Sequence, residues 1–127
     1  MTFSPEDYAR RRQQAVAAAG VRVELTQGDA ADPPYAAAST DVVFARHVLW
    51  ALPDPATALR RWIRLLRPGG RLLLVEGRWH TGAGISAEEC RRLVLGVRRE
   101  AVVERLSDPL LWGRRVDDER YVMLSRA

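Results

Sequence analysis

Residues 65–77, with the sequence LLRPGGRLLLVEG, constrain the fold more than any other stretch of this chain. The triplet Pro68-Gly69-Gly70 ends a helix and turns the chain, because proline lacks a backbone N–H and glycine tolerates tight turns. The apolar run that follows is typical of a strand buried on both faces, and it ends on Glu76. The stretch therefore predicts a helix–turn–strand unit, with its strand over residues 71–76 and an acidic residue at the end.

Similar signals in the first half of the chain predict further helices and strands. Ser4 followed by Pro5 is a helix start, and Gly20 is the corresponding stop. The alternating sequence VRVEL predicts a strand over residues 21–26, ending near Gly28. The sequence DVVFAR predicts a second strand that is buried on both sides.

The second half continues this alternation. Asp54-Pro55 opens a helix whose apolar stripe consists of Leu59, Trp62, Ile63 and Leu66. Ser86, with Glu89 three residues later, has the form of a capping box and opens another helix. Residues 101–106 and 121–125 predict two closing strands that can pair antiparallel. Strands alternating with helices predict an α/β fold, with a parallel sheet covered on both faces.

The composition limits the chain to one ordinary globular domain. It has 127 residues, of which 47% are hydrophobic and 28% charged. No apolar run reaches the roughly 20 residues of a membrane span, and the N-terminus has no hydrophobic signal region. Cys90 is the single cysteine, which excludes a disulfide framework and a thiolate metal cluster. We therefore expect a cytoplasmic protein without a metal.

The net charge of +4 raises the question of nucleic-acid binding. All 20 basic residues are arginine, and they are scattered among aspartate and glutamate along the chain. A nucleic-acid footprint needs its cations gathered on one surface. The distribution therefore disfavours nucleic acid as a partner.

Three stretches, taken in order, carry a resemblance to a known family. They are GDA after the first predicted strand, DVVFARHVLWALPDP around the second and LLRPGGRLLLVEG around the third. This order resembles the class I S-adenosylmethionine-dependent methyltransferases, and the closing DPLLWGRRVDDERYVMLSRA is similar to the tail of small-molecule methyltransferases from actinobacteria. The resemblance implies a Rossmann-like sheet, mainly parallel with an antiparallel last strand. It also implies S-adenosylmethionine as cofactor and a small-molecule acceptor.

The resemblance assigns the cofactor to residues at the ends of the first two strands, because ligands of open parallel sheets lie beyond the carboxyl ends of the strands. Gly28, Asp29 and Ala30 form one group, in which the acid accepts a hydrogen bond from the adenine amino group. The alternative reading is that Gly28 and Asp29 form a plain turn. Arg46 lies along the methionine part of the cofactor.

The resemblance also suggests catalytic and substrate residues. His47 is a candidate base, because imidazole titrates near neutral pH and can accept a proton from the acceptor; the alternative is a merely polar histidine at a strand end. Glu76 faces the substrate pocket or the loop that roofs it, or else it pairs with an arginine such as Arg78. Trp79 is the candidate pocket wall.

Two elements of the family pattern are not found in the sequence. No Gly-x-Gly motif precedes Ser4, and Thr2 occupies the position of the acid that holds the ribose hydroxyls. We therefore expect a methyltransferase domain truncated at its N-terminus, with a gap at the centre of the sheet. The gap closes by direct pairing of the neighbouring strands, or a second copy or a partner chain fills it, or the protein is only marginally folded. A gene start placed too far downstream would also explain the missing elements.

Three functions are consistent with these observations. The first is methyl transfer to an O, N or C nucleophile of a small molecule, impaired in this chain. The second is a non-catalytic methyltransferase-like subunit or interaction module. The third, a basic nucleic-acid-binding module, is disfavoured by the scattered arginines.

Overall fold

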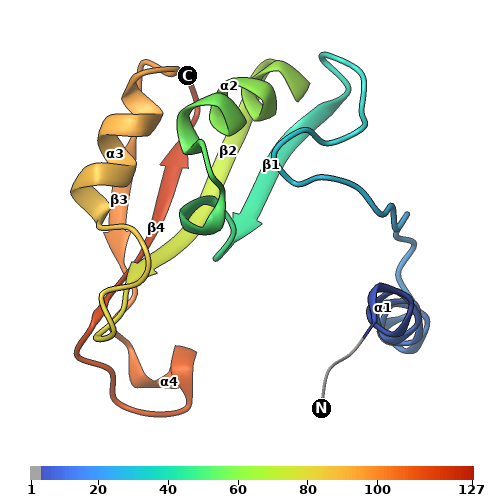
Figure 1. The fold of residues 1–127 in the computed structure, drawn as a ribbon, viewed down its shortest axis with the longest axis horizontal. Helices are drawn as coiled ribbons and strands as arrows, with labels where there is room; N and C mark the ends of the chain where they lie inside the picture. The colour runs from blue at the N-terminus through green and yellow to red at the C-terminus, as the bar shows by residue number, and fades with distance from the viewer. Residues whose placement is uncertain (1–3) are drawn as a thin grey trace.

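The computed structural model describes residues 4–127, so Thr2 lies outside the described residues. The elements in chain order are α1 (Pro5–Ala19), β1 (Thr40–Arg46), η1 (Leu49–Ala51), α2 (Pro55–Leu65), β2 (Leu66–Arg78), α3 (Ala87–Leu95), β3 (Val102–Arg105), α4 (Pro109–Trp112) and β4 (Glu119–Ser125). Figure 1 shows a sheet at the centre of the molecule, with α1 to one side of it.

The described strands form one mixed sheet in the order β1-β2-β4-β3. β1 and β2 are parallel, whereas β4 is antiparallel to both of its neighbours. The α/β class and the antiparallel last strand are confirmed. The parallel part is smaller than expected, since only one of the described strand pairs is parallel.

Residues 21–26 do not form the expected strand. They are exposed and irregular, and β1 lies at the edge of the described sheet. An extended segment becomes a strand only when a neighbour supplies backbone hydrogen bonds. The alternation of Val21, Val23 and Leu25 is therefore present without a pairing partner, and all three side chains are exposed.

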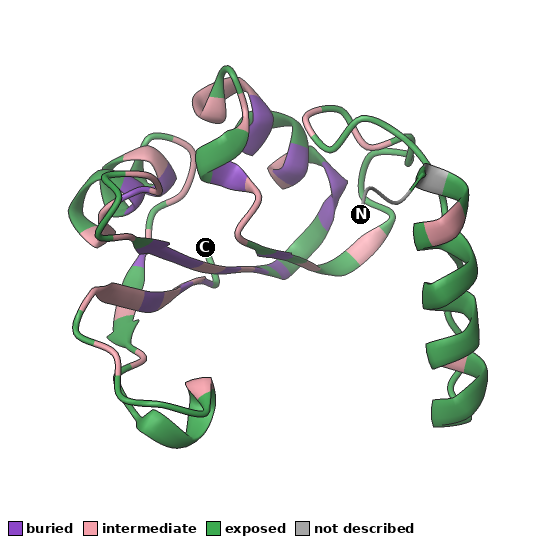
Figure 2. Ribbon diagram, turned by 60° about the horizontal axis from the view of Figure 1, so that its bottom comes forward, coloured by how far each residue is buried: buried purple, intermediate pink, exposed green. Residues whose placement is uncertain are grey.

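Helices cover one face of the sheet only. α2 and α3 lie on the same side, whereas the centre of the other face carries no helix among the described residues (Figure 2). β1 therefore alternates: Ala45 is buried, but Val42 is 51% and Phe44 57% exposed. The expectations of a sheet covered on both faces and of a doubly buried β1 are wrong for the described residues, because the periodicity of a short apolar run does not show what covers it.

The turn Pro68-Gly69-Gly70 lies inside β2 rather than before it. α2 ends at Leu65, so Leu66 belongs to the strand and not to the helical stripe. Thr40 is paired with Leu66, whereas Val42 is paired with Arg71, so the triplet is accommodated as an irregularity in the register. Gly69 adopts a φ of 80°, a left-handed conformation that glycine takes without steric cost.

The predicted helix caps are confirmed. The Ser4 hydroxyl accepts from Asp7 N, and α1 ends at Gly20 in the left-handed conformation. Asp54 accepts from Thr57 N at the start of α2, and Ser86 accepts from Glu89 N at the start of α3. No helix of the described residues is both long enough and apolar enough to cross a membrane.

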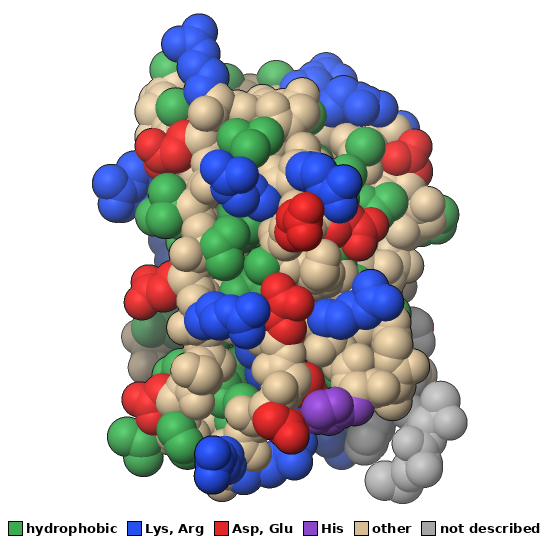
Figure 3. Space-filling model, turned by 90° about the vertical axis from the view of Figure 1, so that its left-hand side faces the viewer, with side chains coloured by type: hydrophobic (Ala, Val, Ile, Leu, Met, Phe, Trp, Pro, Cys, Tyr) green, Lys and Arg blue, Asp and Glu red, His purple; other side chains and the backbone are tan. Residues whose placement is uncertain are grey.

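The core lies between the sheet and the α2–α3 layer. Its fully buried members include Leu59, Leu72, Leu74, Cys90 and Met123. Burial raises the pKa of the Cys90 thiol to about 12, so this side chain packs as a neutral thiol. On the side of the molecule shown in Figure 3, arginine and acidic side chains are interspersed, as the sequence indicated.

Candidate active site at the carboxyl ends of β1 and β2

Two parallel strands bring three of the predicted residues to one end of the sheet. Arg46 is paired with Val75, so Arg46 and His47 lie beside Glu76 in the register. The His47 backbone N–H donates to Val75 O at 2.9 Å, which ties the end of β1 to β2. The expectation that these residues share the carboxyl end of the sheet is confirmed for Arg46, His47 and Glu76.

Glu76 is fully buried. Its Oε1 accepts a hydrogen bond from Leu49 N at 2.9 Å, at the start of η1. No ion pair joins it to Arg78 within residues 4–127, and its Oε2 has no hydrogen-bond partner there. The ion pair with Arg78 is therefore wrong for the described residues, and the carboxyl group holds the turn that follows β1; its place toward a substrate pocket stays a prediction.

Burial raises the pKa of the Glu76 carboxyl group, because a charged form in the interior loses its hydration. The hydrogen bond from Leu49 N opposes this rise, and the nearby backbone N–H groups of Val48 and Trp50 add to its effect. Folding therefore favours the protonated form of Glu76. The catalytic role suggested by the sequence stays a prediction.

His47 has a strained backbone and an unpaired ring nitrogen. Its φ is 56°, which is uncommon for a residue with a side chain. The Nε2 atom is buried without a hydrogen-bond partner. Burial lowers the pKa of the imidazole, and Arg46 and Arg120 lower it further by repelling a second positive charge. The ring is therefore neutral near pH 7 and able to accept a proton.

An aromatic ring packs against His47, and a second ring packs against the first. The Trp79 ring lies edge-on to the imidazole, with 5.0 Å between the ring centroids, and Trp50 lies 6.2 Å from Trp79. Trp79 is half-buried and packs closely over Gly77 and Gly84, where an added Cβ would collide with its ring. Its role as a pocket wall stays a prediction, but the structure places it directly against His47.

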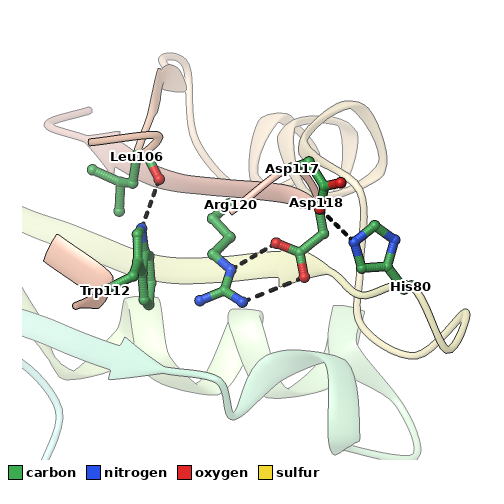
Figure 4. Close-up of polar contacts among 6 residues, drawn as sticks. All are labelled: His80, Leu106, Trp112, Asp117, Asp118 and Arg120. Atoms are coloured by element: carbon green, nitrogen blue, oxygen red, sulfur yellow. Dashed lines mark hydrogen bonds and ion pairs between the residues drawn. The ribbon is translucent and has the colours of Figure 1, made fainter. Parts of the chain in front are cut away.

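A cationic and aromatic group, made up of Arg46, Trp112, Asp118 and Arg120, lies at the same end of the sheet. Figure 4 shows Trp112, Asp118 and Arg120 of this group. The Arg120 guanidinium lies 4.3 Å from the centroid of the Trp112 ring, and the Arg46 guanidinium lies 6.0 Å from it. Arg120 also makes two hydrogen bonds to Asp118, at 2.8 and 3.3 Å. Trp112 is fixed by a 2.8 Å hydrogen bond from its Nε1 to Leu106 O.

Asp29 lies in a turn that is anchored to α2. Its Oδ1 accepts from Ala31 N at 2.9 Å, and Trp62 Nε1 donates to Ala30 O at 2.7 Å. Asp29 and Gly28 are exposed, and the ring of Pro34 packs on Gly28. Asp29 does make the turn contact that the sequence allowed, and its cofactor contact stays a prediction.

The anchored turn and the end of β1 border a common cavity of about 260 Å³. It is lined mainly by apolar side chains, and Ala30, Ala45, Arg46, Val48 and Trp62 are among its walls. The structure therefore brings Ala30 and Arg46 together, with Asp29 next to Ala30 in the chain. His47, Glu76 and Trp79 are not among the lining residues of this cavity.

Two charged members of the cationic and aromatic group, Arg120 and Asp118, were not predicted from the sequence. They lie in the segment VDDER, whose last two residues begin β4, and Trp112 precedes that segment. Their position follows from the strand register: β4 runs antiparallel to β2, and Arg120 is paired with Gly77, so the start of β4 lies beside the end of β2. That pairing is not visible in local sequence patterns.

A comparison with family descriptions gives one match over more than half of the chain. Residues 1–74 match the family described as "Methyltransferase domain". The match covers α1, β1, α2 and the part of β2 up to Leu74. It therefore includes the Asp29 turn, Arg46 and His47.

Curated proteins of two kinds are similar in sequence. One is the 27-O-demethylrifamycin SV methyltransferase of Amycolatopsis mediterranei (strain S699), 47% identical over 53 residues, or 42% of this chain. The other is the fumosorinone synthetase of Cordyceps fumosorosea (strain ARSEF 2679), 42% identical over 79 residues, or 62% of this chain. The chain spans 20% of the first protein and 2% of the second.

Solved structures share the fold at low sequence identity. The trans-methyltransferase CalH, in complex with SAH, has a TM-score of 0.73 and 23% identity, covering 98% of this chain and 40% of CalH. The 1,6-didemethyltoxoflavin-N1-methyltransferase of Burkholderia thailandensis has a TM-score of 0.68 and 21% identity, covering 98% of this chain and 57% of that protein. These likenesses establish the Rossmann-like methyltransferase fold.

Replacing Glu76 tests its part in holding η1. Glu76→Leu should lower the free energy of unfolding by about 1–3 kcal/mol, because Leu49 N would lose its buried acceptor. Glu76→Gln keeps an acceptor oxygen and should cost less. Urea unfolding of both variants at pH 7 measures the difference.

The pH dependence gives a separate check. The pKa of Glu76 is higher in the folded protein than its unfolded value of about 4.5, so protonated Glu76 stabilises the fold fully when the pH is below 4.5. This stabilisation is lost as the pH rises through the folded-state pKa. The wild type should therefore lose stability relative to Glu76→Gln as the pH rises above 4.5 and through the raised folded-state pKa. Parallel stability profiles of the two proteins would contradict this account of Glu76.

Proposed function

Since this chain belongs to the methyltransferase domain family, we propose that its function is S-adenosylmethionine-dependent methyl transfer to a small-molecule acceptor. The functions of similar proteins support this proposal. One similar protein is a methyltransferase of a rifamycin, and a structural neighbour carries S-adenosylhomocysteine together with 1,6-didemethyltoxoflavin. The observation on which the proposal mainly depends is the buried Nε2 of His47, which has no hydrogen-bond partner at the end of β1, in an imidazole whose pKa is lowered by burial and by two arginines.

The residues around the Asp29 turn fit one side of the cofactor. The Asp29 carboxylate is exposed, and only its Oδ1 is engaged, by Ala31 N. It can therefore accept a hydrogen bond from an adenine amino group. Ala30 and Arg46 border the adjoining cavity, where Arg46 can lie along the methionine part of the cofactor. When bound, S-adenosylmethionine supplies an electrophilic methyl group.

His47 is the proposed base for the acceptor. A buried ring nitrogen without a hydrogen-bond partner is energetically costly. The Nε2 atom would gain a partner when a hydroxyl or amine of the acceptor donates a hydrogen bond, and then a proton, to it. Because Nε2 is buried and Trp79 packs on the ring, an acceptor reaches Nε2 only when the Trp79 side chain shifts. Glu76 acts indirectly by holding η1, the turn that follows His47.

We expect this 127-residue chain to bind the cofactor weakly. Its cavity of about 260 Å³ is below the range of about 300–1,000 Å³ typical of small-molecule sites. The 127 residues contain no Gly-x-Gly before Ser4 and no acid at position 2 to hold the ribose. Two lost charged or multidentate contacts weaken binding by roughly two to four decades, which moves a micromolar site toward the millimolar range.

The same proposal places the protein in the cytoplasm, supported by its single, buried cysteine.

Titration with S-adenosylhomocysteine tests the Asp29 assignment. Asp29→Ala should weaken binding about tenfold or more, because a charged hydrogen-bond acceptor is removed. Asp29→Asn, which keeps the acceptor for Ala31 N, should weaken binding less. Equal affinities of all three proteins by calorimetry would leave Asp29 as a turn residue only, and micromolar binding by the wild-type monomer would refute the expected weakness.

A second candidate function, a methyltransferase-like interaction subunit, is favoured by the free edge of β1. A groove of about 470 Å³ runs beside this strand, and its walls include Glu24, Tyr35, Val42, Val43 and Phe44. Unpaired strand edges bind extended chains through their backbone groups. We propose that a second copy or a partner chain pairs with β1, filling the gap that the sequence predicted.

The mass in solution tests this second candidate. We expect the purified chain to self-associate at high concentration, and Phe44→Glu to reduce the association because it places a charge beside the free edge. Val102→Glu is the matched control, since Val102 is similarly exposed, at 53%, and lies on β3, the strand at the opposite edge of the described sheet. A monomer at every concentration, in light scattering, would exclude the second copy, and an equal effect of both variants would contradict the edge as the contact.

A further inference from the structure

The cationic and aromatic group beyond β1 contains one guanidinium that is neutralised and one that is not. Arg120 is paired with Asp118 through two hydrogen bonds, and its guanidinium lies over the Trp112 ring. Arg46 lies over the same ring at 6.0 Å, and no carboxylate pairs with it within residues 4–127. Arg46 therefore presents an unpaired positive charge at the end of the sheet.

The neighbouring acidic groups are engaged elsewhere. Asp117 pairs with His80 at 2.7 Å, and Glu119 accepts from Ala87 N at 2.8 Å. Asp118 already neutralises Arg120, as Figure 4 shows. The charge of Arg46 is thus left for a ligand, and a guanidinium is well suited to a planar carboxylate because its N–H groups can form two parallel hydrogen bonds.

The groups next to Arg46 favour an aromatic ligand. His47 follows Arg46 directly, and its ring contacts Trp79, which in turn lies beside Trp50. Trp50 is 40% exposed and Trp79 is half-buried, so Trp79 presents ring surface beside the imidazole and Trp50 presents ring surface beside Trp79. Aromatic side chains bind a planar ring through offset or edge contacts.

We propose that Arg46, supported by Trp112, binds the carboxylate of an aromatic acceptor whose hydroxyl faces His47. This inference rests on the proposed methyl transfer and names the class of acceptor: an aromatic hydroxy acid. Arg120 and Asp118 act as positioning residues, because they fix the ring over which Arg46 lies. Trp50 and Trp79 contact the aromatic body of the ligand.

The test compares 4-hydroxybenzoate with 4-hydroxybenzamide, which differ in charge and hardly in shape. Titrations followed by the amide resonances of the protein should show about tenfold tighter binding of the carboxylate, the contribution of one charge-assisted contact. Arg46→Gln should abolish this preference, and Arg46→Lys should retain part of it, because the charge remains without the planar fork. Arg71→Gln is the matched control, since Arg71 is an exposed arginine toward the other end of β2, and it should keep the full preference.

A carboxylate on the cofactor is the other ligand that Arg46 could bind. S-adenosylhomocysteine carries an amino-acid carboxylate, whereas 5′-methylthioadenosine does not. If Arg46→Gln weakens only S-adenosylhomocysteine and leaves 4-hydroxybenzoate unchanged, the inference is overturned. It is also overturned if the wild type shows no preference for the carboxylate, or if the preference survives in Arg46→Gln.

The outcomes separate this inference from the proposed function. Loss of the carboxylate preference in Arg46→Gln, in a chain that binds no S-adenosylhomocysteine, supports the anion site and contradicts the cofactor assignment. Binding of S-adenosylhomocysteine without any preference for 4-hydroxybenzoate contradicts the anion site and leaves methyl transfer standing. The dispersion of the amide resonances shows in each case that the variant is folded.

Discussion

The hydrogen bond from Leu49 N to the buried carboxyl group of Glu76 is the interaction on which the candidate site depends. It joins the end of β2 to the turn that leaves β1, and His47 lies between that turn and the strand. A buried acceptor that is lost leaves a backbone donor unsatisfied, which is more costly than an exposed contact that breaks. Glu76 thereby helps to hold η1 and, through it, the strained backbone of His47.

Groups that control the charge of His47 lie at the same end of the sheet. Arg46 and Arg120 repel a proton from His47, and Asp118 cancels one of these two cations. A neutral imidazole beside an unpaired guanidinium is an arrangement that can accept a proton while attracting an anion. The site is therefore organised by local electrostatics as much as by the shape of a cavity.

Much of the fold could be predicted from the sequence because its signals are local. Ser4, Asp54 and Ser86 cap helices through contacts within three residues, and Gly20 ends α1 for a steric reason. The placement of Arg46, His47 and Glu76 at one end of the sheet follows from the parallel order of two strands. These predictions needed no information about distant parts of the chain.

What could not be predicted depends on distant partners. Residues 21–26 alternate like a strand but have no neighbour to pair with, and β1 looks buried in sequence although one of its faces is open. The direction of the Glu76 side chain is set by η1, 27 residues earlier in the chain. Arg120 meets Trp112 and the end of β2 only through the antiparallel register of β4.

The protonation of His47 is the most direct test of this account. An NMR titration of the two imidazoles, with His47→Gln used to assign the resonances, measures the pKa of His47 in the folded chain. The account predicts a value below the ordinary 6.5, because burial and the cations Arg46 and Arg120 disfavour the charged ring. It also predicts that Arg46→Gln moves the value back toward 6.5. A pKa at or above 6.5 in the wild type would contradict the neutral base at the end of β1 and the charge arrangement around it.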